Sequence, residues 1–586
     1  MINPSSLRPR EVARPRMTRS TSRVFQFSSA LLFTILIVAV PSNSAFAKKR
    51  RRPPPSPTPT VSPTPTPTPT PTPAPTPSQA DAARFLTQST FGPTTALISQ
   101  VQQLGFNAFL DRQFAAPAMS TLAISDALVS QLPAGTGASY PQFQDAWWYV
   151  VVKANDQLRQ RVAFALSEIM VISANGSGMY EHPEAMGTYW DVLARDAFGN
   201  FRQLIDDVTL NPGMGDYLDM VHNDKPNPHR NTQPNENYAR ELMQLFTIGL
   251  YKLNQDGSQQ LDLNGQPVPT YDQDVVEGYA HVFTGWYWAQ SGTPTWSYVT
   301  PNYRQPMLAF PDHHDTGAKL ILNGVTIPAG QTQAQDLQMA LDAIFNHPNV
   351  GPFVGKQLIQ RLVTSNPSPA YISRVASAFA NNGQGVRGDM KAVLRAILLD
   401  PEARDSAAAL SNSGFGHQRE PLIRLATVLR TFNASSSSGK LSVTGANSNF
   451  SQAPLYAPSV FNFFSPFYSQ VGAIASAGDV APEFQITTDT TVITSANKMR
   501  SAVYQQPNPN NPDAIVLDLS AQTSLASNPA VLVDSLNTLL MSGQMSASMR
   551  SIVVNAVTQI PAANTLERAQ TAVHLIVTSP EFVIQK

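Results

Sequence analysis

Apolar residues recur every three or four positions over most of the chain from about Gln79 onward, the spacing of one face of an α-helix. In segment 156–173, Leu158, Val162 and Ile169 fall on one such face. The same period predicts helices over 198–209, 337–345, 352–363, 371–380, 388–399, 420–432, 529–540 and 565–577. No pattern of alternating strands and crossover helices occurs, nor does G-x-G-x-x-G or a P-loop sequence. We therefore expect an all-α, predominantly helical fold rather than a nucleotide-binding α/β domain.

Long polar loops interrupt the predicted helices. They cover 220–234, then 254–269 with its Asp-Gly and Asn-Gly turn signals, and then a Ser/Gly/Asn-rich stretch at 434–451. A chain of 586 residues can bury a large core. Residues 79–586 are thus expected to form one large globular domain, which the loop at 434–451 can divide into two lobes.

The first 78 residues have the composition of a targeting segment followed by a linker. Scattered arginines precede an apolar run at 30–40 and a small-x-small sequence at 45–47, which is typical of a secretory signal peptide over 1–47. The run is shorter than the roughly 20 residues of a membrane-spanning helix, which favours cleavage over a retained anchor. Residues 48–78 are basic and then Pro/Thr-rich, which predicts a disordered, extended linker. We expect a secreted, periplasmic or cell-surface protein.

Charge and cysteine content remove several classes of function. The formal net charge is zero, so a basic surface for nucleic acid is not expected. Cysteine is absent, which excludes disulfides, thiol nucleophiles and iron–sulfur clusters. No nucleotide or haem motif was found either, and any metal site would have to use His, Asp, Glu, Asn or backbone oxygen.

The stretch 234–249, PNENYARELMQLFTIG, combines unusual polar residues with a helical period. On a helical wheel Glu236, Asn237, Arg240 and Glu241 share one arc with Gln244, and the apolar residues fill the other. Pairs four residues apart give ordinary surface stabilisation. Residue physics alone therefore favours a core helix with a solvated face, although the same side chains can line a polar cavity if another segment covers them.

A second polar helix is predicted about thirty residues later. Thr270 and Gln273 have the spacing of a capping box, which places a helix start at Thr270. Asp274, Glu277 and His281 lie on its polar face. Glu277 and His281 could bind one metal ion, but a salt bridge is the commoner outcome of this spacing.

A third polar cluster is the turn-like segment 311–319, PDHHDTGAK. Asp312, His313, His314 and Asp315 are consecutive, and loops carry function more often than helix faces do. A polar loop that caps neighbouring helices explains them equally well.

Taken together, the sequence resembles the bacterial family catalogued as domain of unknown function 1800. The blocks that carry this resemblance run in order from about Ala83 to Tyr468: ARFLTQSTFGPT, LRQRVAFALSEI, AFGNFRQLIDDVTLNPGMGDYLD, PNENYARELMQLFTIG, TYDQDVVEGYAHVFTGW, HHDTGAK, GVRGDMKAVLRAILLDPEAR, REPLIR and APSVFNFFSPFY. The resemblance implies an exported protein of unassigned biochemistry, often encoded beside a sulfatase-like exported protein. It also implies that the following polar residues share one centre: Glu236, Asn237, Arg240, Glu241, Asp274, Trp286, His314, Asp315, Lys319, Arg419 and Glu420.

Two hypotheses follow, and the sequence leaves open whether the protein is an enzyme. The first is a hydrolase of an extracellular polymer such as a polysaccharide, because carboxylate pairs and aromatic rings are what sugar chemistry uses. Its predicted catalytic residues are Glu236, Glu241, Asp274 and Glu277. Its predicted substrate-binding residues are Asn237, Arg240, Trp286, His314, Asp315 and Lys319.

The second hypothesis is a non-catalytic envelope or matrix protein, whose polar signatures are buried ion-pair networks. Calcium is a lesser alternative for a bound ion. The oxygen ligands would come from the loop residues Asn254, Asp256, Asp262, Asn264 and Asp272, whose spacing does not reproduce an EF-hand.

Overall fold

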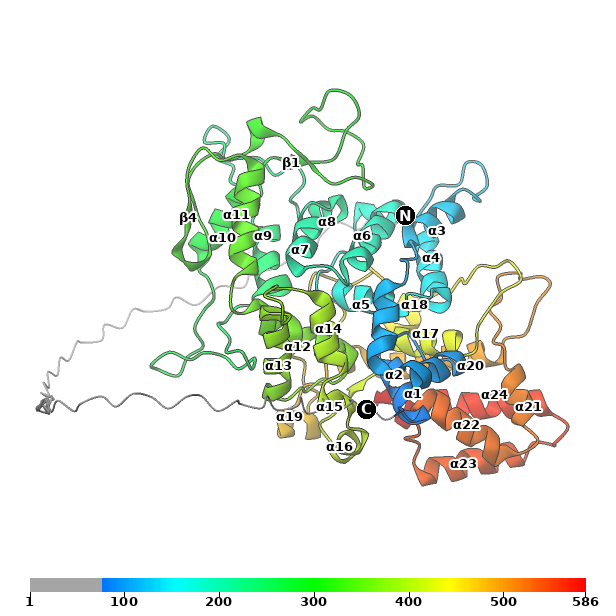
Figure 1. The fold of residues 1–586 in the computed structure, drawn as a ribbon. Coiled ribbons are helices and arrows are strands. Elements are labelled where there is room, and N and C mark those ends of the chain that lie inside the picture. The colour runs from blue at the N-terminus through cyan, green and yellow to red at the C-terminus, as the bar shows by residue number, and fades with distance from the viewer. Residues whose placement is uncertain (1–75) are drawn as a thin grey trace, which may run out of the picture. The chain divides into compact units, whose positions relative to one another are not determined.

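Helices dominate the part of the chain that the structure describes, residues 76–586 of a computed structural model (Figure 1). The predominantly helical class predicted from periodicity is thereby confirmed. The predicted signal peptide lies outside the described residues, as does all of the predicted linker except residues 76–78.

The described helices fall into three stretches of the chain. The N-terminal ones are α1 (Gln79–Ser89), α2 (Thr95–Ala115), α3 (Thr121–Val129), α4 (Tyr140–Lys153), α5 (Gln157–Ser167), α6 (Pro183–Asp196), α7 (Phe201–Thr209) and α8 (Pro212–Tyr217). The central ones are α9 (Asn237–Glu241), α10 (Gln273–Val282), α11 (Gln333–Phe345), α12 (Val350–Leu362), α13 (Pro369–Ala380) and α14 (Met390–Leu398). The C-terminal ones are α15 (Pro401–Arg404), α16 (Ser406–Ser411), α17 (Pro421–Thr431), α18 (Ala446–Phe450), α19 (Ala473–Ala477), α20 (Asp489–Tyr504), α21 (Ser520–Leu525), α22 (Pro529–Met541), α23 (Ala547–Thr558), α24 (Thr565–Val577) and α25 (Pro580–Val583).

Shorter elements join these helices. Single 3₁₀ turns are η1 (Gly178–Glu181), η3 (Pro311–His313), η4 (Leu322–Gly324) and η5 (Pro482–Ile486). Two-residue strands form three antiparallel pairs: β1 (Trp286–Tyr287) with β2 (Leu308–Ala309), β3 (Lys319–Leu320) with β4 (Thr326–Ile327), and β5 (His417–Gln418) with β6 (Ile584–Gln585). The last pair ties the end of the chain to the segment before α17. Figure 1 shows α9, α10 and α11 with β1 and β4 at one end, and α21 to α24 at the other.

Large aromatic side chains fill the core between α4 and α6. Trp147, Trp148 and Trp190 are fully buried, and the rings of Trp147 and Trp190 meet edge to face with centroids 5.8 Å apart. Burying a large apolar side chain contributes about 1.5–3 kcal/mol. Apolar positions at helical spacing therefore form this core, as the sequence pattern requires.

The stretch around 234–249 departs from the straight helix that was predicted. Only α9 is α-helical, and it continues as the π-helix η2 (Leu242–Thr247). Gly249 follows with φ +72°, and an added Cβ there would lie 2.7 Å from the Phe353 ring. The wider turn and the glycine bend carry the chain away from the predicted helix axis after Thr247.

The second polar helix begins later than its proposed capping box. Asp272 caps α10, because its side chain accepts a hydrogen bond from the Val275 N–H. The Thr270 hydroxyl instead donates to the Gly249 carbonyl, at 2.5 Å. The capping-box prediction at Thr270 is therefore wrong, since a competing cap lies two residues further on.

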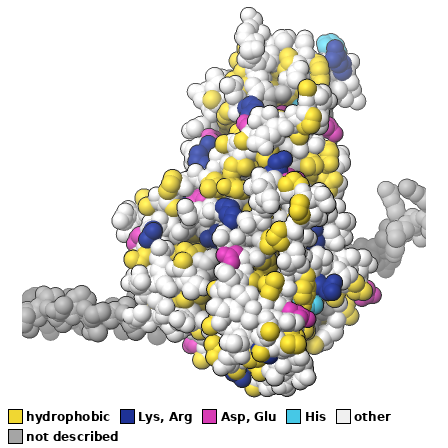
Figure 2. Space-filling view, turned by 90° about the vertical axis from the view of Figure 1, so that its right-hand side faces the viewer, with side chains coloured by type: hydrophobic (Ala, Val, Ile, Leu, Met, Phe, Trp, Pro, Cys, Tyr) yellow, Lys and Arg dark blue, Asp and Glu magenta, His cyan; other side chains and the backbone are white. Residues whose placement is uncertain are grey.

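The described surface carries charges of both signs. On the face drawn in Figure 2, basic and acidic side chains are interspersed among polar and hydrophobic ones. Among the residues described, no helix has both the length and the apolar character needed to cross a membrane.

Candidate functional site

The two helices predicted to carry the catalytic carboxylates, α9 and α10, lie against each other. Glu236 forms an ion pair with Arg240 at 2.7 Å, and the Gln273 amide donates to Glu236 at 3.0 Å. The same amide donates to Glu277 at 3.3 Å. Glu236 and Glu277 are thus joined through one glutamine on a largely open surface.

The other two predicted carboxylates have different surroundings. Asp274 is exposed on α10, whereas Glu241 is half-buried and has one carboxylate oxygen without a hydrogen-bond partner. Burial raises the pKa of Glu241, against the opposing charge of Arg240. Neither of the two cavities described below is lined by the four predicted catalytic residues.

Two of the predicted substrate-binding residues, His314 and Lys319, belong to a buried ion-pair network. Both bind Asp336 of α11, His314 through Nε2 at 2.9 Å and Lys319 through Nζ at 2.7 Å. All three side chains are at most 2% exposed. The Lys319 ammonium also donates to the carbonyls of Asp315 and Gly317. This network fixes segment 313–319 against α11 and leaves none of the three side chains open to a ligand from solvent.

Asp315 pairs with His281 at the edge of that network. The hydrogen bond from His281 lowers the pKa of Asp315 to about 2, although partial burial opposes this. The predicted polar faces of segments 270–288 and 311–319 therefore do meet, through the hydrogen bond between His281 and Asp315.

Replacing Asp315 by asparagine should lower the free energy of unfolding by about 1–2 kcal/mol at neutral pH, after a discount for solvent screening. The pKa of Asp315 in the folded protein lies below its unfolded value of about 3.9. The stabilisation by Asp315 is therefore complete above about pH 3.9 and is lost as the pH falls towards the folded-state pKa. Urea unfolding of both proteins at several pH values measures it. Asp312→Asn, an exposed neighbour, is the control, and a difference that stays constant down to pH 3 would contradict the assignment.

Two carboxylates and several aromatic rings line a hollow of about 220 Å³, which we call the Asp216 hollow. Its lining residues come from α8 and the turn after it, from β1 and the residue that follows, and from the loop beyond: Gly215, Asp216, Asp219, Val221, His222, Tyr287, Trp288 and Tyr298. Tyr298 is 85% exposed, and the indole N–H of Trp288 has no hydrogen-bond partner. The hollow thus offers two carboxyl groups, an unused donor and ring faces in one place.

The two carboxyl groups of the Asp216 hollow are held differently. The Tyr303 hydroxyl donates to Asp216 at 2.7 Å, and burial, aided by the nearby charge of Asp219, raises the pKa of Asp216. The Asn237 amide donates to Asp219 at 2.5 Å. Two carboxyls in unlike surroundings are the arrangement that separates acid and base roles.

Asn237 links the sequence prediction to this hollow. It was predicted to bind substrate, and its amide donates a hydrogen bond to Asp219. Asp219 itself has φ +57°, a backbone conformation that non-glycine residues adopt rarely and that clusters at functional sites.

Aromatic stacking supports the rim of the Asp216 hollow. The His222 ring stacks on Trp296 with centroids 4.5 Å apart, and Trp296 stacks on His313 at 4.0 Å. The backbone N–H of His222 donates to the Trp286 carbonyl at 2.8 Å. Trp286, a predicted substrate-binding residue, is buried, so it supports the hollow through its backbone.

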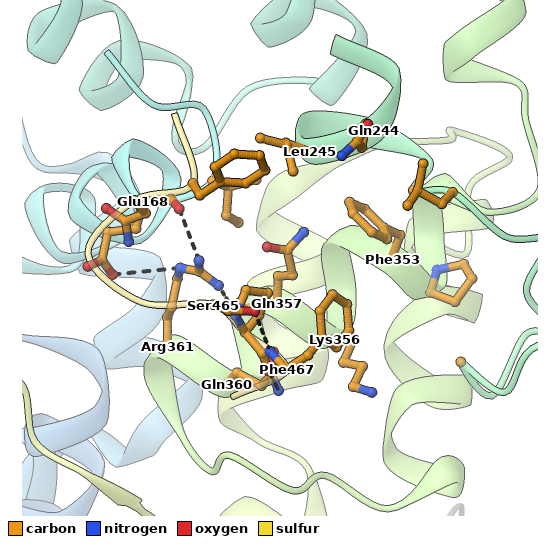
Figure 3. A pocket seen from close by; sticks show the side chains of 18 of the residues that line it. Glu168, Gln244, Leu245, Phe353, Lys356, Gln357, Gln360, Arg361, Ser465 and Phe467 are labelled. Atoms are coloured by element: carbon orange, nitrogen blue, oxygen red, sulfur yellow. Dashed lines mark hydrogen bonds and ion pairs between the residues drawn. The ribbon is translucent and has the colours of Figure 1, made fainter. Parts of the chain in front are cut away.

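A larger cavity of about 610 Å³, the Glu168 cavity, lies between the end of α5, η2, the segment after Gly249, α12 and the loop 460–467 (Figure 3). Arg361 binds the backbone carbonyl of Glu168 at 3.0 Å, and its Nε lies 3.6 Å from the Glu168 carboxylate. Burial, reinforced by the charge of Glu420, raises the pKa of Glu168 well above its ordinary value. The nearby guanidinium groups of Arg361 and Arg161 oppose this shift.

Glu420 of the signature Arg-Glu-Pro lies behind this cavity and is 1% exposed. Gln452 donates to Glu420 and, at 3.4 Å, to Glu168. Arg419 is also buried, and it packs over the Phe582 ring at 4.6 Å. The predicted polar centre is therefore divided: Arg419 and Glu420 are sealed inside, whereas Glu236 and Arg240 lie on the surface.

Asn349 fixes the segment that forms one wall of the Glu168 cavity. Its amide donates to the carbonyls of Ile248 and Tyr251, each at 2.8 Å, and its oxygen accepts from the Leu253 N–H at 2.9 Å. Asn349 is 1% exposed, so water cannot replace these bonds.

Asn349→Ala should lower the free energy of unfolding by about 2–4 kcal/mol, because three backbone groups lose a buried partner. It should also speed amide hydrogen exchange across 248–253. Asn346→Ala, an exposed change in the same turn, is the control and should stay within about 0.5 kcal/mol of wild type. Equal effects of both changes would contradict the assigned role of Asn349.

The loop considered for calcium forms a ribbon with isolated bridges, Leu253↔Gln259 and Leu261↔Pro267. The Asp256 and Asp262 side chains accept hydrogen bonds from backbone N–H groups of their own turns. Within residues 76–586 no group of three or more His, Asp or Glu side chains is arranged to hold a metal ion.

The fold and the cavities define a predominantly helical protein with an acidic, aromatic-lined hollow and a separate, largely apolar cavity. The model of the family described as "Protein of unknown function (DUF1800)" matches residues 84–584, and the chain belongs to this family. Comparison with curated proteins and with solved structures gave no match.

Proposed function

We propose that this protein is an exported hydrolase of an extracellular polysaccharide, with the Asp216 hollow as its active site. The observation that carries the proposal is the convergence of Asp216 and Asp219 with aromatic residues on one open hollow. Asp216, whose pKa is raised by burial, is suited to donate a proton to the glycosidic oxygen. Asp219 is suited to accept a proton from the attacking water.

The aromatic residues supply the sugar-binding part of the proposal. Tyr298 presents an exposed ring at the rim, and Trp288 has a free N–H donor for a sugar hydroxyl. Asp216 and Asp219 take the place of the carboxylates predicted on α9 and α10. Glu236 and Glu277 both accept hydrogen bonds from Gln273 on the surface, and neither lines the Asp216 hollow or the Glu168 cavity.

The test is release of reducing ends from a panel of purified polysaccharides, such as xylan, mixed-linkage glucan, chitosan and pectin. The wild-type protein should release reducing ends from at least one of them. An Asp216→Asn preparation purified in parallel identifies a contaminating enzyme. Wild-type protein that is inactive on the whole panel, or activity shared equally by both preparations, would contradict the proposal.

A second candidate function is a non-catalytic envelope protein. The sealed networks around Asp336 and around Glu420 favour it, since they explain two of the polar signatures by packing alone. Association with a sulfatase-like exported protein stays a prediction under either function. Binding of a polysaccharide without release of reducing ends would favour the second candidate.

A further inference from the structure

The Glu168 cavity concentrates buried polar atoms that have no hydrogen-bond partner. The atoms are Gln357 Nε2, Gln360 Oε1 and Asn462 Nδ2, and all three residues line this cavity. Glu168 Oε2 and Arg361 Nε also lack hydrogen bonds, but they pair with each other at 3.6 Å. Each of these residues is at most 7% exposed. Because buried polar groups are nearly always bonded, their gathering around one cavity points to a bound molecule.

Most of the unused groups are donors. Gln357 and Asn462 each contribute an N–H, whereas the Arg361 Nε–H lies 3.6 Å from the Glu168 carboxylate. Gln360 is the acceptor among them, because its amide N–H₂ already donates to the carbonyls of Ser365 and Pro466 at 3.1 Å. An excess of donors matches a ligand group that only accepts hydrogen bonds.

Lys356 adds a positive charge to the same cavity. It lies on α12, is mostly buried and is 5.9 Å from the centroid of the Phe467 ring. Among the described residues, no carboxylate forms an ion pair with it. Burial lowers its pKa, which an anion beside it would reverse.

The remaining walls are apolar. Ile169, Leu245, Phe353 and Phe464 contribute to the lining. Three further hydrophobic residues that line the cavity are unusually exposed: Leu250 at 47%, Phe461 at 60% and Phe467 at 64%. Figure 3 shows Phe353, Leu245 and Phe467 around the space in front of Glu168 and Arg361. These walls suit a hydrocarbon chain or ring, and they offer few partners for the hydroxyls of a sugar.

We propose that the Glu168 cavity binds an amphipathic carboxylic acid, whose carboxylate lies among Lys356, Gln357 and Asn462 and whose apolar body lies against the phenylalanines. This site is separate from the Asp216 hollow, since the two cavities share no lining residue. The inference therefore stands or falls independently of polysaccharide hydrolysis.

The experiment is isothermal titration calorimetry of the full chain with decanoate, 1-decanol and decyltrimethylammonium. Decanoate should bind with a stoichiometry near one, and the other two probes should bind at least about tenfold more weakly, because neither carries the carboxylate that accepts charge-assisted hydrogen bonds. Equal binding of decanoate and 1-decanol would overturn the proposed carboxylate recognition. No binding of decanoate would overturn the site.

Lys356→Met tests the anion contact, because methionine keeps the apolar stem. It should weaken decanoate about tenfold or more and leave 1-decanol unchanged. Lys252→Met is the matched control, since Lys252 is exposed between the lining residues Tyr251 and Leu253 but does not line the cavity. Equal weakening by both variants would overturn the proposal.

Gln357→Glu serves as the second variant if Lys356→Met does not fold. It sets a negative charge against the ligand carboxylate and should abolish decanoate binding. Retained decanoate binding would overturn the proposal.

Discussion

Asp216→Asn should lower kcat for polysaccharide hydrolysis by about 10²–10⁴-fold, the range of general acid–base catalysis. Asparagine keeps the shape of the side chain and can still bond the Tyr303 hydroxyl, so the fold and KM should change little. In the wild type, activity should fall as the pH rises through the raised pKa of Asp216, because only the protonated carboxyl can donate. That alkaline limb should be absent in the variant. Initial rates of reducing-end release across pH measure both effects.

The controls for this prediction separate the Asp216 hollow from other carboxylates. Asp534→Asn changes an exposed aspartate of α22 that pairs with Arg550, and it should leave the rate unchanged. Glu236→Gln tests the residue favoured by sequence reasoning. Loss of activity in Glu236→Gln, with Asp216→Asn fully active, would move the active site to the face of α9 and α10.

Asp336→Asn should have the largest effect on stability, about 3–5 kcal/mol, because it leaves the buried charge of Lys319 without its counter-charge. Lys319 and Asp336 are 1% and 0% exposed, so water cannot compensate. Asparagine fills the same volume, which excludes a cavity as the cause. Urea unfolding, followed by circular dichroism, gives the change in the midpoint.

A control on the same helix makes the stability prediction specific. Asp342 of α11 pairs with Arg202 at 2.6 Å but is 57% exposed. Asp342→Asn should cost less than about 1 kcal/mol, the usual range for a surface pair. If the two variants unfold at the same urea concentration, burial does not determine the strength of the Asp336 network.

Helices were predictable where a long apolar stripe recurs at helical spacing. Segment 565–577 was predicted with the same bounds as α24, and 529–540 differs from α22 by one residue. Segment 234–249 was not predictable in detail, because a π-helix does not follow the 3.6-residue period on which a helical wheel depends. The start of α10 was misplaced because Thr270 and Asp272 are both good caps, and only the fold decides between them.

The site was harder to predict than the fold. The predicted residues Asn237 and Trp286 do support the Asp216 hollow, and His314, Asp315 and Lys319 do gather beside α10. Asp216 and Asp219 were missed because α8 is short and Asp219 lies in the turn after it, so the pair gives no periodic signal. One sequence clue was present: DYLD ends the block that precedes PNENYARE, and Asp219 of DYLD accepts a hydrogen bond from Asn237 of that segment.

The Glu168 cavity illustrates a more general limit. Glu168, Arg361 and Asn462 come from the C-terminal cap of α5, from α12 and from the loop after α18, and neither their spacing nor their neighbours connects them. Contacts between residues this far apart arise from packing, so a single sequence cannot specify them.

A crystal structure of the Asp216→Asn variant with an oligosaccharide released by the wild-type protein tests the central claim most directly. We predict a sugar ring against Tyr298 and Trp288, with its glycosidic oxygen within hydrogen-bond distance of residue 216 and a hydroxyl on the Trp288 N–H. An oligosaccharide bound on the face of α9 and α10 beside Glu236 and Glu277, with the Asp216 hollow empty, would contradict it.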